Sequence, residues 1–139
     1  MSVIETASEI ATEQAGERFA RGLTARSVVL LYGDLGAGKT AFVRGMARGL
    51  GADPEEVSSP TFTLVQEYAG TTATLHHVDL YRLEPHEIDD LGLDDLIESG
   101  GIAAIEWADR WPARPGDALQ VRIDLLGGDR RRITFSSPS

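Results

Sequence analysis

Residues 33–40 read Gly-Asp-Leu-Gly-Ala-Gly-Lys-Thr and match the pattern G-x-x-x-x-G-K-[ST] at every fixed position. Glycines let the backbone curve round phosphate groups with its N–H groups pointing inwards, and the helix that follows adds the positive end of its dipole. Lys39 would neutralise the β- and γ-phosphates, while the Thr40 hydroxyl would bind Mg²⁺. The pattern therefore predicts a phosphate-binding loop, or P-loop, for a nucleoside triphosphate with magnesium. The predicted nucleotide-binding residues are Gly33, Asp34, Leu35, Gly36, Ala37, Gly38, Lys39, Thr40 and the adjoining Ala41.

Two acidic residues stand at the ends of apolar segments, where chemistry explains an acid better than solubility does. Asp79 closes the segment 75–78, and Glu106 closes the segment 102–105. A P-loop site needs an acid beside the metal, commonly at the end of a neighbouring strand. We expect one of the two to bind or orient the Mg²⁺ shell and the other to polarise the attacking water. The sequence leaves open which acid has which role.

Three further groups of side chains have both a functional and a structural interpretation. In the segment 58–61, a hydroxyl would act as a switch at the γ-phosphate or metal, or Pro60 would simply fix a turn at the entry to a strand. Trp107 would either pack in the core or cover the nucleotide. His76 and His77 adjoin in a predicted strand and so face opposite sides, which disfavours a metal pair. We expect one of these histidines in the core and one in solvent.

The identity of the base follows from the use of lysine. Lys39 is the only lysine in the chain, and the other basic residues are all Arg. Lys and Arg are not equivalent at phosphate sites, so the single exception at the loop is informative. Guanine-specific P-loop proteins usually read the base with an Asn-Lys-x-Asp motif, which a chain with one lysine at position 39 cannot contain. The sequence therefore predicts ATP as the nucleotide.

The elements that would position these residues alternate between helix and strand. Thr6 and Glu9 form a capping box that predicts a helix reaching about Arg21. An almost purely apolar run over 27–32 is typical of a strand buried on both faces. The remaining predictions are a helix over 40–50 capped by Gly51, a hairpin of 61–68 and 72–79, one or two short acidic helices over 84–96, a strand over 102–106 and a terminal hairpin of 118–125 and 130–136. This order predicts an α/β, P-loop NTPase-like three-layer fold whose mixed sheet is parallel in the centre and antiparallel at its edges.

The bulk composition restricts the class of protein. The chain has 139 residues, which argues for one domain over residues 1–139. A net charge of −9 makes direct, extended contact with nucleic acid a poor prospect, because such binding depends on neutralising phosphates. Cysteine is absent, and neither a membrane-length apolar run nor a secretory signal is evident, so we expect a cytoplasmic protein that does not contact a membrane.

Four segments together resemble the TsaE family, in the same order and at the same spacing. They are the loop 33–40, Ser-Pro-Thr-Phe-Thr-Leu-Val at 59–65, His-Val-Asp-Leu-Tyr-Arg-Leu at 77–83 and Ile-Glu-Trp at 105–107. The resemblance implies a small bacterial ATPase, dependent on ATP and Mg²⁺, that acts with the TsaB–TsaD complex. That complex forms N6-threonylcarbamoyladenosine on tRNAs that read ANN codons. The resemblance also implies that tRNA is reached only through the partners, which agrees with the acidic charge.

The resemblance assigns roles residue by residue. Lys39 and Thr40 match the phosphate and Mg²⁺ residues, Asp79 a Walker-B-like acid, and Glu106 an acid taken as a metal ligand and important for hydrolysis. By the same resemblance, Thr61 lies in a switch-like loop and Trp107 beside the active site, while Ser8 and the region of Gly128 lie near the adenine. The implied catalytic set is Lys39, Asp79, Glu106, Thr61 and Trp107. Ala41 departs from the pattern, since many relatives carry a second Thr there.

Two other functions remain open on the sequence. A small-molecule kinase would need an acceptor pocket and an Arg-bearing lid, yet Arg82 is the only basic residue over 52–106. A non-catalytic nucleotide switch would use binding without turnover. No Arg is obviously placed as a finger in cis and no catalytic Gln is evident. We therefore expect slow hydrolysis by the protein alone and stimulation by its partners.

Overall fold

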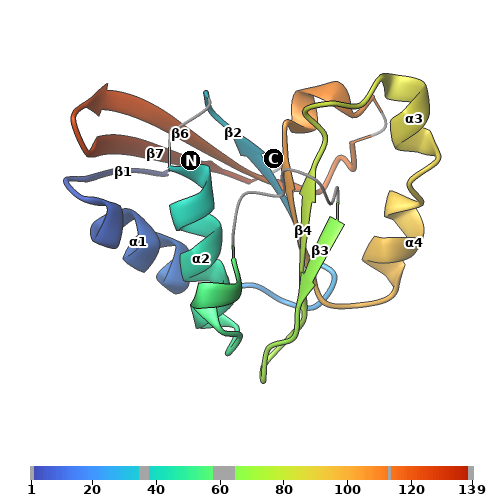
Figure 1. The fold of residues 1–139 in the computed structure, drawn as a ribbon, viewed down its shortest axis with the longest axis horizontal. Helices are drawn as coiled ribbons and strands as arrows, with labels where there is room; N and C mark the ends of the chain where they lie inside the picture. Colours follow the sequence, from blue (N-terminus) through green and yellow to red (C-terminus); the bar gives the residue numbers. More distant parts are fainter. Residues whose placement is uncertain (1, 35–37, 58–64, 113, 138–139) are drawn as a thin grey trace.

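The computed structural model describes residues 2–34, 38–57, 65–112 and 114–137. Thirteen elements are present in this part of the chain. In order, they are β1 (Ser2–Thr6), α1 (Glu9–Arg21), β2 (Val28–Tyr32), α2 (Lys39–Gly49), η1 (Pro54–Glu56), β3 (Val65–Tyr68), β4 (Leu75–Asp79), α3 (Pro85–Asp89), α4 (Leu93–Glu98), β5 (Ile102–Glu106), η2 (Ala108–Arg110), β6 (Leu119–Gly127) and β7 (Arg130–Ser136). Helices α1 and α2 cover one face of the sheet, and α3 and α4 lie on the other side (Figure 1). The three layers are those that the sequence predicts.

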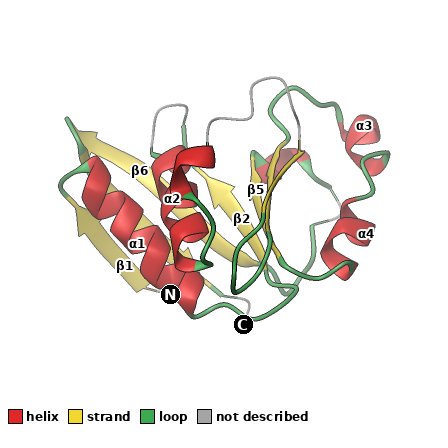
Figure 2. Cartoon of the chain, turned by 60° about the horizontal axis from the view of Figure 1, so that its bottom comes forward, coloured by secondary structure: helices red, strands yellow, loops and turns green. Residues whose placement is uncertain are grey.

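The seven strands form one sheet in the order β1-β7-β6-β2-β5-β4-β3. In the centre, β2 runs parallel to both β5 and β6, and β4 runs parallel to β5. At the two edges, β3 is antiparallel to β4, while β7 is antiparallel to β6 and β1 to β7. Figure 2 shows β6, β2 and β5 side by side in this twisted sheet, with β1 at its edge. The predicted mixed sheet, with a parallel centre and antiparallel edges, is confirmed.

The sheet has a separate apolar core on each face. The core between the sheet and helices α1 and α2 contains Phe42, Met46 and Leu31. The other core, beneath α3 and α4, contains Ile105 and other residues of β4, β5 and η2. The residues of β2 from 28 to 31 are all buried and alternate between the two cores, as expected for a central strand covered on both faces. This rigid central strand leads directly into the predicted phosphate-binding loop.

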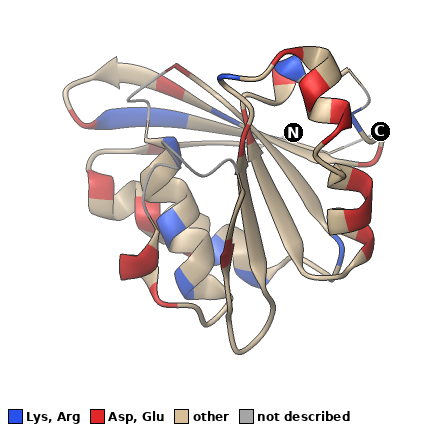
Figure 3. Cartoon of the chain, turned by 45° about the vertical axis from the view of Figure 1, so that its right-hand side comes forward, with Lys and Arg blue, Asp and Glu red and all other residues tan. Residues whose placement is uncertain are grey.

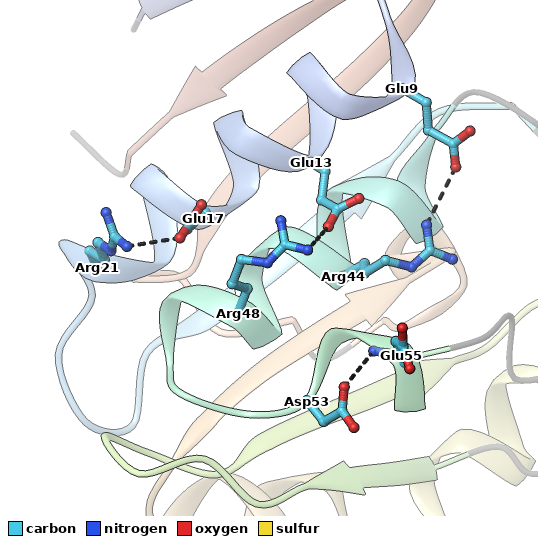
Figure 4. Close-up of polar contacts among 8 residues, drawn as sticks. All are labelled: Glu9, Glu13, Glu17, Arg21, Arg44, Arg48, Asp53 and Glu55. Carbon is cyan, nitrogen blue, oxygen red and sulfur yellow. Dashed lines mark hydrogen bonds and ion pairs between the residues drawn. The ribbon is translucent and has the colours of Figure 1, made fainter.

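Helices α1 and α2 pack unusually closely because glycines stand at their crossing. A Cβ on Gly16 would lie 2.1 Å from the carbonyl oxygen of Phe42, and one on Gly45 would lie 1.8 Å from that of Glu13. Two ion pairs join the same helices: Glu13 to Arg48 at 2.7 Å and Glu9 to Arg44 at 3.4 Å (Figure 4). The first turn of α2 is thereby held against α1.

Replacing Gly45 with alanine should destabilise the protein. The added methyl cannot fit beside the backbone of Glu13, so the helices must separate, at a cost of about 1–3 kcal/mol that exceeds the gain in helix propensity. Chemical denaturation would measure the change. Gly116→Ala is the matched control, since nothing lies within 4 Å of its added Cβ. Equal stabilities of the two variants would contradict this view of the crossing.

The structure corrects the predicted start of the first helix. Its N-cap is Ser8, whose hydroxyl accepts a hydrogen bond from the N–H of Ala11 at 3.0 Å. Thr6, the predicted cap, instead ends β1, and its hydroxyl pairs with that of Thr12 at 2.7 Å. The sequence interpretation missed β1 because a five-residue edge strand shows little pattern until its partner β7 is known.

The other predicted elements are found close to their expected positions. Gly51, the expected end of the second helix, follows α2 with φ +83°, a conformation that favours glycine. The two predicted hairpins pair as β3–β4 and β6–β7, and residues 61–64 lie outside the described part. The acidic segment forms the two short helices α3 and α4, along which Asp and Glu gather in Figure 3. Its acids are all exposed: Glu84, Glu87, Asp89, Asp90, Asp94, Asp95 and Glu98.

Within the described residues, the helices are too short or too polar for any of them to cross a membrane.

Candidate nucleotide-binding site

The predicted phosphate-binding loop joins the central strand to the first turn of α2. Strand β2 ends at Tyr32, Gly33 follows with φ +144°, and Gly38 caps the helix with φ +99°. Both values are ones that glycine adopts without the strain a Cβ would cause. Residues 35–37, which contain the predicted Leu35, Gly36 and Ala37, lie outside the described part. The described ends of the loop have the strand–turn–helix geometry that phosphate-binding loops require.

The only lysine of the chain is nearly enclosed at the start of this helix. Lys39 is 5% exposed, and its Nζ donates a hydrogen bond to the carbonyl oxygen of Gly33 at 2.7 Å. The same ammonium lies 4.4 Å from the ring centroid of Trp107. Burial lowers the pKa of Lys39, and the carboxylates of Glu106 and Asp79 oppose this change. A cation in such a position gains from a bound anion, which would replace the water that burial removes.

The two predicted acids are neighbours at one edge of the sheet. Asp79 ends β4, Glu106 ends β5, and the two residues stand directly opposite each other in the register of these parallel strands. Burial raises the pKa of Asp79, the nearby Glu106 raises it further, and a hydrogen bond from the N–H of Tyr81 at 2.9 Å lowers it. Two carboxylates side by side repel each other unless a cation lies between them or beside them.

Removing the charge of Asp79 should stabilise the protein when nucleotide and metal are absent. The pKa of Asp79 in the folded state exceeds the ordinary 3.8, so between these two pKa values the folded state binds more protons than the unfolded state. The free energy of unfolding therefore falls as the pH rises from 3.8 through the pKa of the folded state. Asp79→Asn keeps an oxygen for the N–H of Tyr81 but carries no charge. We expect a higher melting temperature than wild type at pH 7, and no difference below pH 3.8. Asp117→Asn, at an exposed loop position, is the control.

If Asp117→Asn also raised the melting temperature, the lower net negative charge of the protein would explain the effect. The loss of a half-buried charge beside Glu106 would then not be its cause. An Asp79→Asn protein that melts below wild type at pH 7 would contradict the prediction directly.

A hollow of about 310 Å³ brings the predicted residues together. Its lining comes from the loop, from the ends of β4 and β5, from α1 and from the β6–β7 turn. The residues are Glu9, Thr12, Gly38, Lys39, Thr40, Ala41, Asp79, Glu106, Trp107, Asp129 and Arg131. Four carboxylates thus face two basic side chains, a balance that suits an anion accompanied by a divalent cation.

Trp107 forms a wall of this hollow, and it also packs against the apolar core beneath α3 and α4. Its ring stacks on the Lys39 ammonium and lies 4.8 Å from the ring of Tyr81. On another side it borders a second hollow of about 200 Å³, which Asp34 also lines. The backbone of Trp107 has φ +59°, a left-handed conformation that costs a bulky residue about 1–3 kcal/mol. Its position thus combines the two interpretations in part, since it contacts the core and also borders the hollow, and contact with a nucleotide stays a prediction.

The elements predicted beside the adenine do converge on the hollow, through residues other than those predicted. Helix α1 contributes Glu9 and Thr12, whereas the Ser8 hydroxyl is used in capping that helix. The β6–β7 turn contributes Asp129, while Gly128 accepts a hydrogen bond through its carbonyl oxygen. Thr61, the predicted switch residue, lies outside the described part.

Arg131 is a residue of the site that the sequence interpretation missed. The sequence interpretation placed it only at the entry to a strand, and it does lie in β7, but it also lines the hollow. Its Nε lies 3.5 Å from the position of a Cβ on Gly38, and its Nη1 donates to the carbonyl oxygen of Gly128 at 2.8 Å. The alternation of side chains along a strand could have revealed it. Ile133 and Phe135 face the core beneath α1, so Arg131, two residues before Ile133, lies on the same face of the sheet.

His77 was also missed, and the prediction for the two histidines is wrong in part. Both are buried, with His76 5% and His77 0% exposed, so neither faces solvent. His76 lies 3.3 Å from the carbonyl oxygen of Gly100 and 3.4 Å from the Glu67 carboxylate. The Nε2 of His77 lies 2.5 Å from Oε2 of Glu106. The alternation of the strand correctly places the two rings on opposite faces, but helices lie on both sides of the sheet (Figure 1) and both rings are buried.

The fold and the site define an α/β protein of the P-loop NTPase-like class, with a mixed sheet and acids at the ends of neighbouring parallel strands. The sequence model of a family described as "Threonylcarbamoyl adenosine biosynthesis protein TsaE" matches residues 6–133. The chain therefore belongs to the TsaE family, whose role is in the biosynthesis of threonylcarbamoyladenosine in tRNA.

Individual relatives agree with this assignment. A tRNA threonylcarbamoyladenosine biosynthesis protein TsaE from Nostoc sp. is 45% identical over 127 residues, which cover 88% of this chain and 78% of the relative. The protein of the same name from Treponema pallidum is 41% identical over 127 residues, which cover 90% of this chain and 93% of the relative. The crystal structure of YdiB from Bacillus subtilis superposes with a TM-score of 0.79 at 32% identity, covering 99% of this chain and 86% of that one.

Proposed function

We propose that the protein is a Mg²⁺-dependent ATPase that acts with the TsaB–TsaD complex in forming N6-threonylcarbamoyladenosine on tRNAs that read ANN codons. One observation supports the ATPase most strongly. A nearly buried ammonium, that of Lys39, stands at the start of a helix, beside two carboxylates that the register of β4 and β5 places opposite each other. Membership of the TsaE family supports the process in which the activity is used.

The chain's own groups account for binding of the triphosphate. Lys39 neutralises the terminal phosphates, and the N-terminus of α2 directs backbone N–H groups toward them. Arg131 adds a second cation to the lining of the hollow, close to Gly38. Trp107 offers an aromatic face at the rim. A phosphate chain would thus meet two positive side chains, those of Lys39 and Arg131.

The donor set fits a magnesium ion that also binds ATP. Thr40, Asp79 and Glu106 supply one hydroxyl and two carboxylates, the oxygen ligands that Mg²⁺ prefers. No three His, Cys, Asp or Glu residues in the described part of the chain form a metal cluster of their own. Mg²⁺ commonly keeps several waters and completes its shell with substrate phosphates, so two carboxylates suffice. When bound, it would neutralise charge that develops on the phosphates.

The two acids divide the remaining work. Glu106 is 5% exposed, so its carboxylate is held more firmly than one in solvent. We assign it to the metal and to the orientation of the attacking water. Asp79, already held by the N–H of Tyr81, completes the metal shell. Each carboxylate has a hydrogen-bond partner within the protein, which would reduce the reorganisation needed for hydrolysis.

The charge of the protein suits a partner that reaches tRNA indirectly. The net charge is −9, and exposed acids cover α3 and α4 (Figure 3). Such a surface repels a nucleic-acid backbone, so the tRNA would be held by TsaB–TsaD and not by this chain.

A pull-down with TsaB and TsaD, with and without ATP, tests the proposed partnership. We expect the protein to be retained by the TsaB–TsaD complex and the amount retained to change when ATP and Mg²⁺ are added. Bovine serum albumin, which is also acidic, serves as the control for charge alone. Failure of TsaB–TsaD to retain the protein under any nucleotide condition would refute the partnership.

A further inference from the structure

The histidine that precedes the metal-side aspartate is enclosed within the sheet and contacts the neighbouring glutamate. His77 is 0% exposed, and its Nε2 lies 2.5 Å from Oε2 of Glu106. We propose that His77 is a positioning residue: its Nε2–H donates to Glu106 and fixes the orientation in which that carboxylate serves the Mg²⁺–ATP site. This inference rests on the proposed function and deepens it.

The register of the sheet explains how the imidazole reaches the carboxylate. His77 stands opposite Ala104, and Asp79 stands opposite Glu106. Because side chains alternate along a strand, all four lie on the face that carries α1 and α2. Ala104 carries only a methyl group, so the ring of His77 has room to extend diagonally along β5 toward Glu106. A larger residue at position 104 would block this path.

The other edge of the ring is also held. Nδ1 of His77 lies 3.5 Å from the hydroxyl oxygen of Tyr68, and that hydroxyl donates to Oε1 of Gln66. The rings of Tyr68 and His77 are 6.1 Å apart and tilted by 43°. Strand β3 therefore supports the imidazole from one side while Glu106 is bound on the other. The ring cannot turn away from the carboxylate without displacing the side chain of Tyr68.

Glu106 needs such support because neighbouring charges act on its carboxylate. Lys39 attracts its carboxylate, and Asp79 beside it repels it. The bond to His77 occupies Oε2, which leaves Oε1 for a metal ion or a water. Removing a residue that is hydrogen-bonded to a metal ligand typically lowers metal affinity or activity about 10–100-fold.

Three variants separate positioning from mere structural support. His77→Leu removes the donor and keeps a buried apolar volume, while His77→Gln returns an amide N–H near the place of Nε2. His76→Leu makes the same change at the adjacent buried histidine, whose contacts are to Gly100 and Glu67 and not to the site. Binding of Mn²⁺ to the protein with a non-hydrolysable ATP analogue is measured by electron paramagnetic resonance, together with kcat, KM and melting temperature.

We expect His77→Leu to weaken Mn²⁺ binding and lower kcat about 10–100-fold with little change in KM for ATP. We expect His77→Gln to recover most of both, and His76→Leu to change the melting temperature alone. If His77→Leu does not fold, His77→Asn replaces it, because its amide is too short to span the gap. A folded variant without the donor that keeps wild-type Mn²⁺ affinity and kcat, or a Gln variant as impaired as Leu, overturns the positioning role. Absence of ATP hydrolysis by the wild type would instead refute the proposed function.

Discussion

Lys39→Met is expected to abolish ATP binding at useful concentrations and with it the modification of tRNA. The ammonium is the cation nearest to the described ends of the loop and is almost fully enclosed. Charge-assisted hydrogen bonds of this kind contribute about 3 kcal/mol, which corresponds to roughly a 100-fold loss of affinity. Calorimetric titration with a non-hydrolysable ATP analogue would measure the loss, and cells that carry only the variant should lack the modified nucleoside.

The same substitution should leave the fold intact. Met keeps an unbranched apolar stem in the space beside Trp107 and removes a buried charge, so the protein without nucleotide should be at least as stable as wild type. Arg21→Met removes a cation from the exposed end of α1 and should bind ATP normally. A folded Lys39→Met protein that binds ATP as wild type does would refute the site.

Glu106→Gln should separate binding from hydrolysis. The amide keeps the shape of the carboxylate and an oxygen for the N–H of His77, but it lacks the charge that holds metal and orients water. Loss of a group with such a role typically lowers a rate about 10²–10⁴-fold. We therefore expect ATP binding within a few-fold of wild type, hydrolysis reduced at least about 100-fold, and no modified tRNA. Phosphate release and nucleoside analysis would measure these quantities.

Glu98→Gln, at an exposed position on α4, makes the same chemical change away from the site and should hydrolyse ATP normally. Continued tRNA modification by Glu106→Gln, despite the loss of hydrolysis, would favour the alternative of a nucleotide switch that needs binding alone. Unchanged hydrolysis would show that Glu106 has no part in the reaction.

Much of the fold can be predicted from the sequence because its central elements carry local signals. The apolar runs predict β2 and β5, and glycines mark the described ends of the loop between β2 and α2 and the residue that follows α2. Strand β1 has no such signal, since its five residues become a strand only by pairing with β7. Ser8 and Thr6 are both favourable N-cap residues in isolation, and the end of β1 decides between them.

The site divides in the same way. Lys39 is predictable because it belongs to the loop pattern, and Asp79 and Glu106 because each is an acid at the end of an apolar segment. Arg131 and His77 are not visible in this way, since their roles depend on which strands are neighbours. Arg131 reaches the loop only because the β6–β7 turn lies beside α1, and His77 reaches Glu106 only across the β4–β5 register. Such long-range contacts are fixed by topology and not by local sequence.

Release of phosphate from ATP by the purified protein, measured alone and with the TsaB–TsaD complex, decides whether this fold works as a partner-driven ATPase. We predict slow, Mg²⁺-dependent hydrolysis by the protein alone and faster hydrolysis when the complex is added, with both activities lost in Glu106→Gln. Two results would contradict this function. One is full-speed hydrolysis by the isolated protein with no increase on adding TsaB–TsaD, and the other is no ATP hydrolysis under either condition.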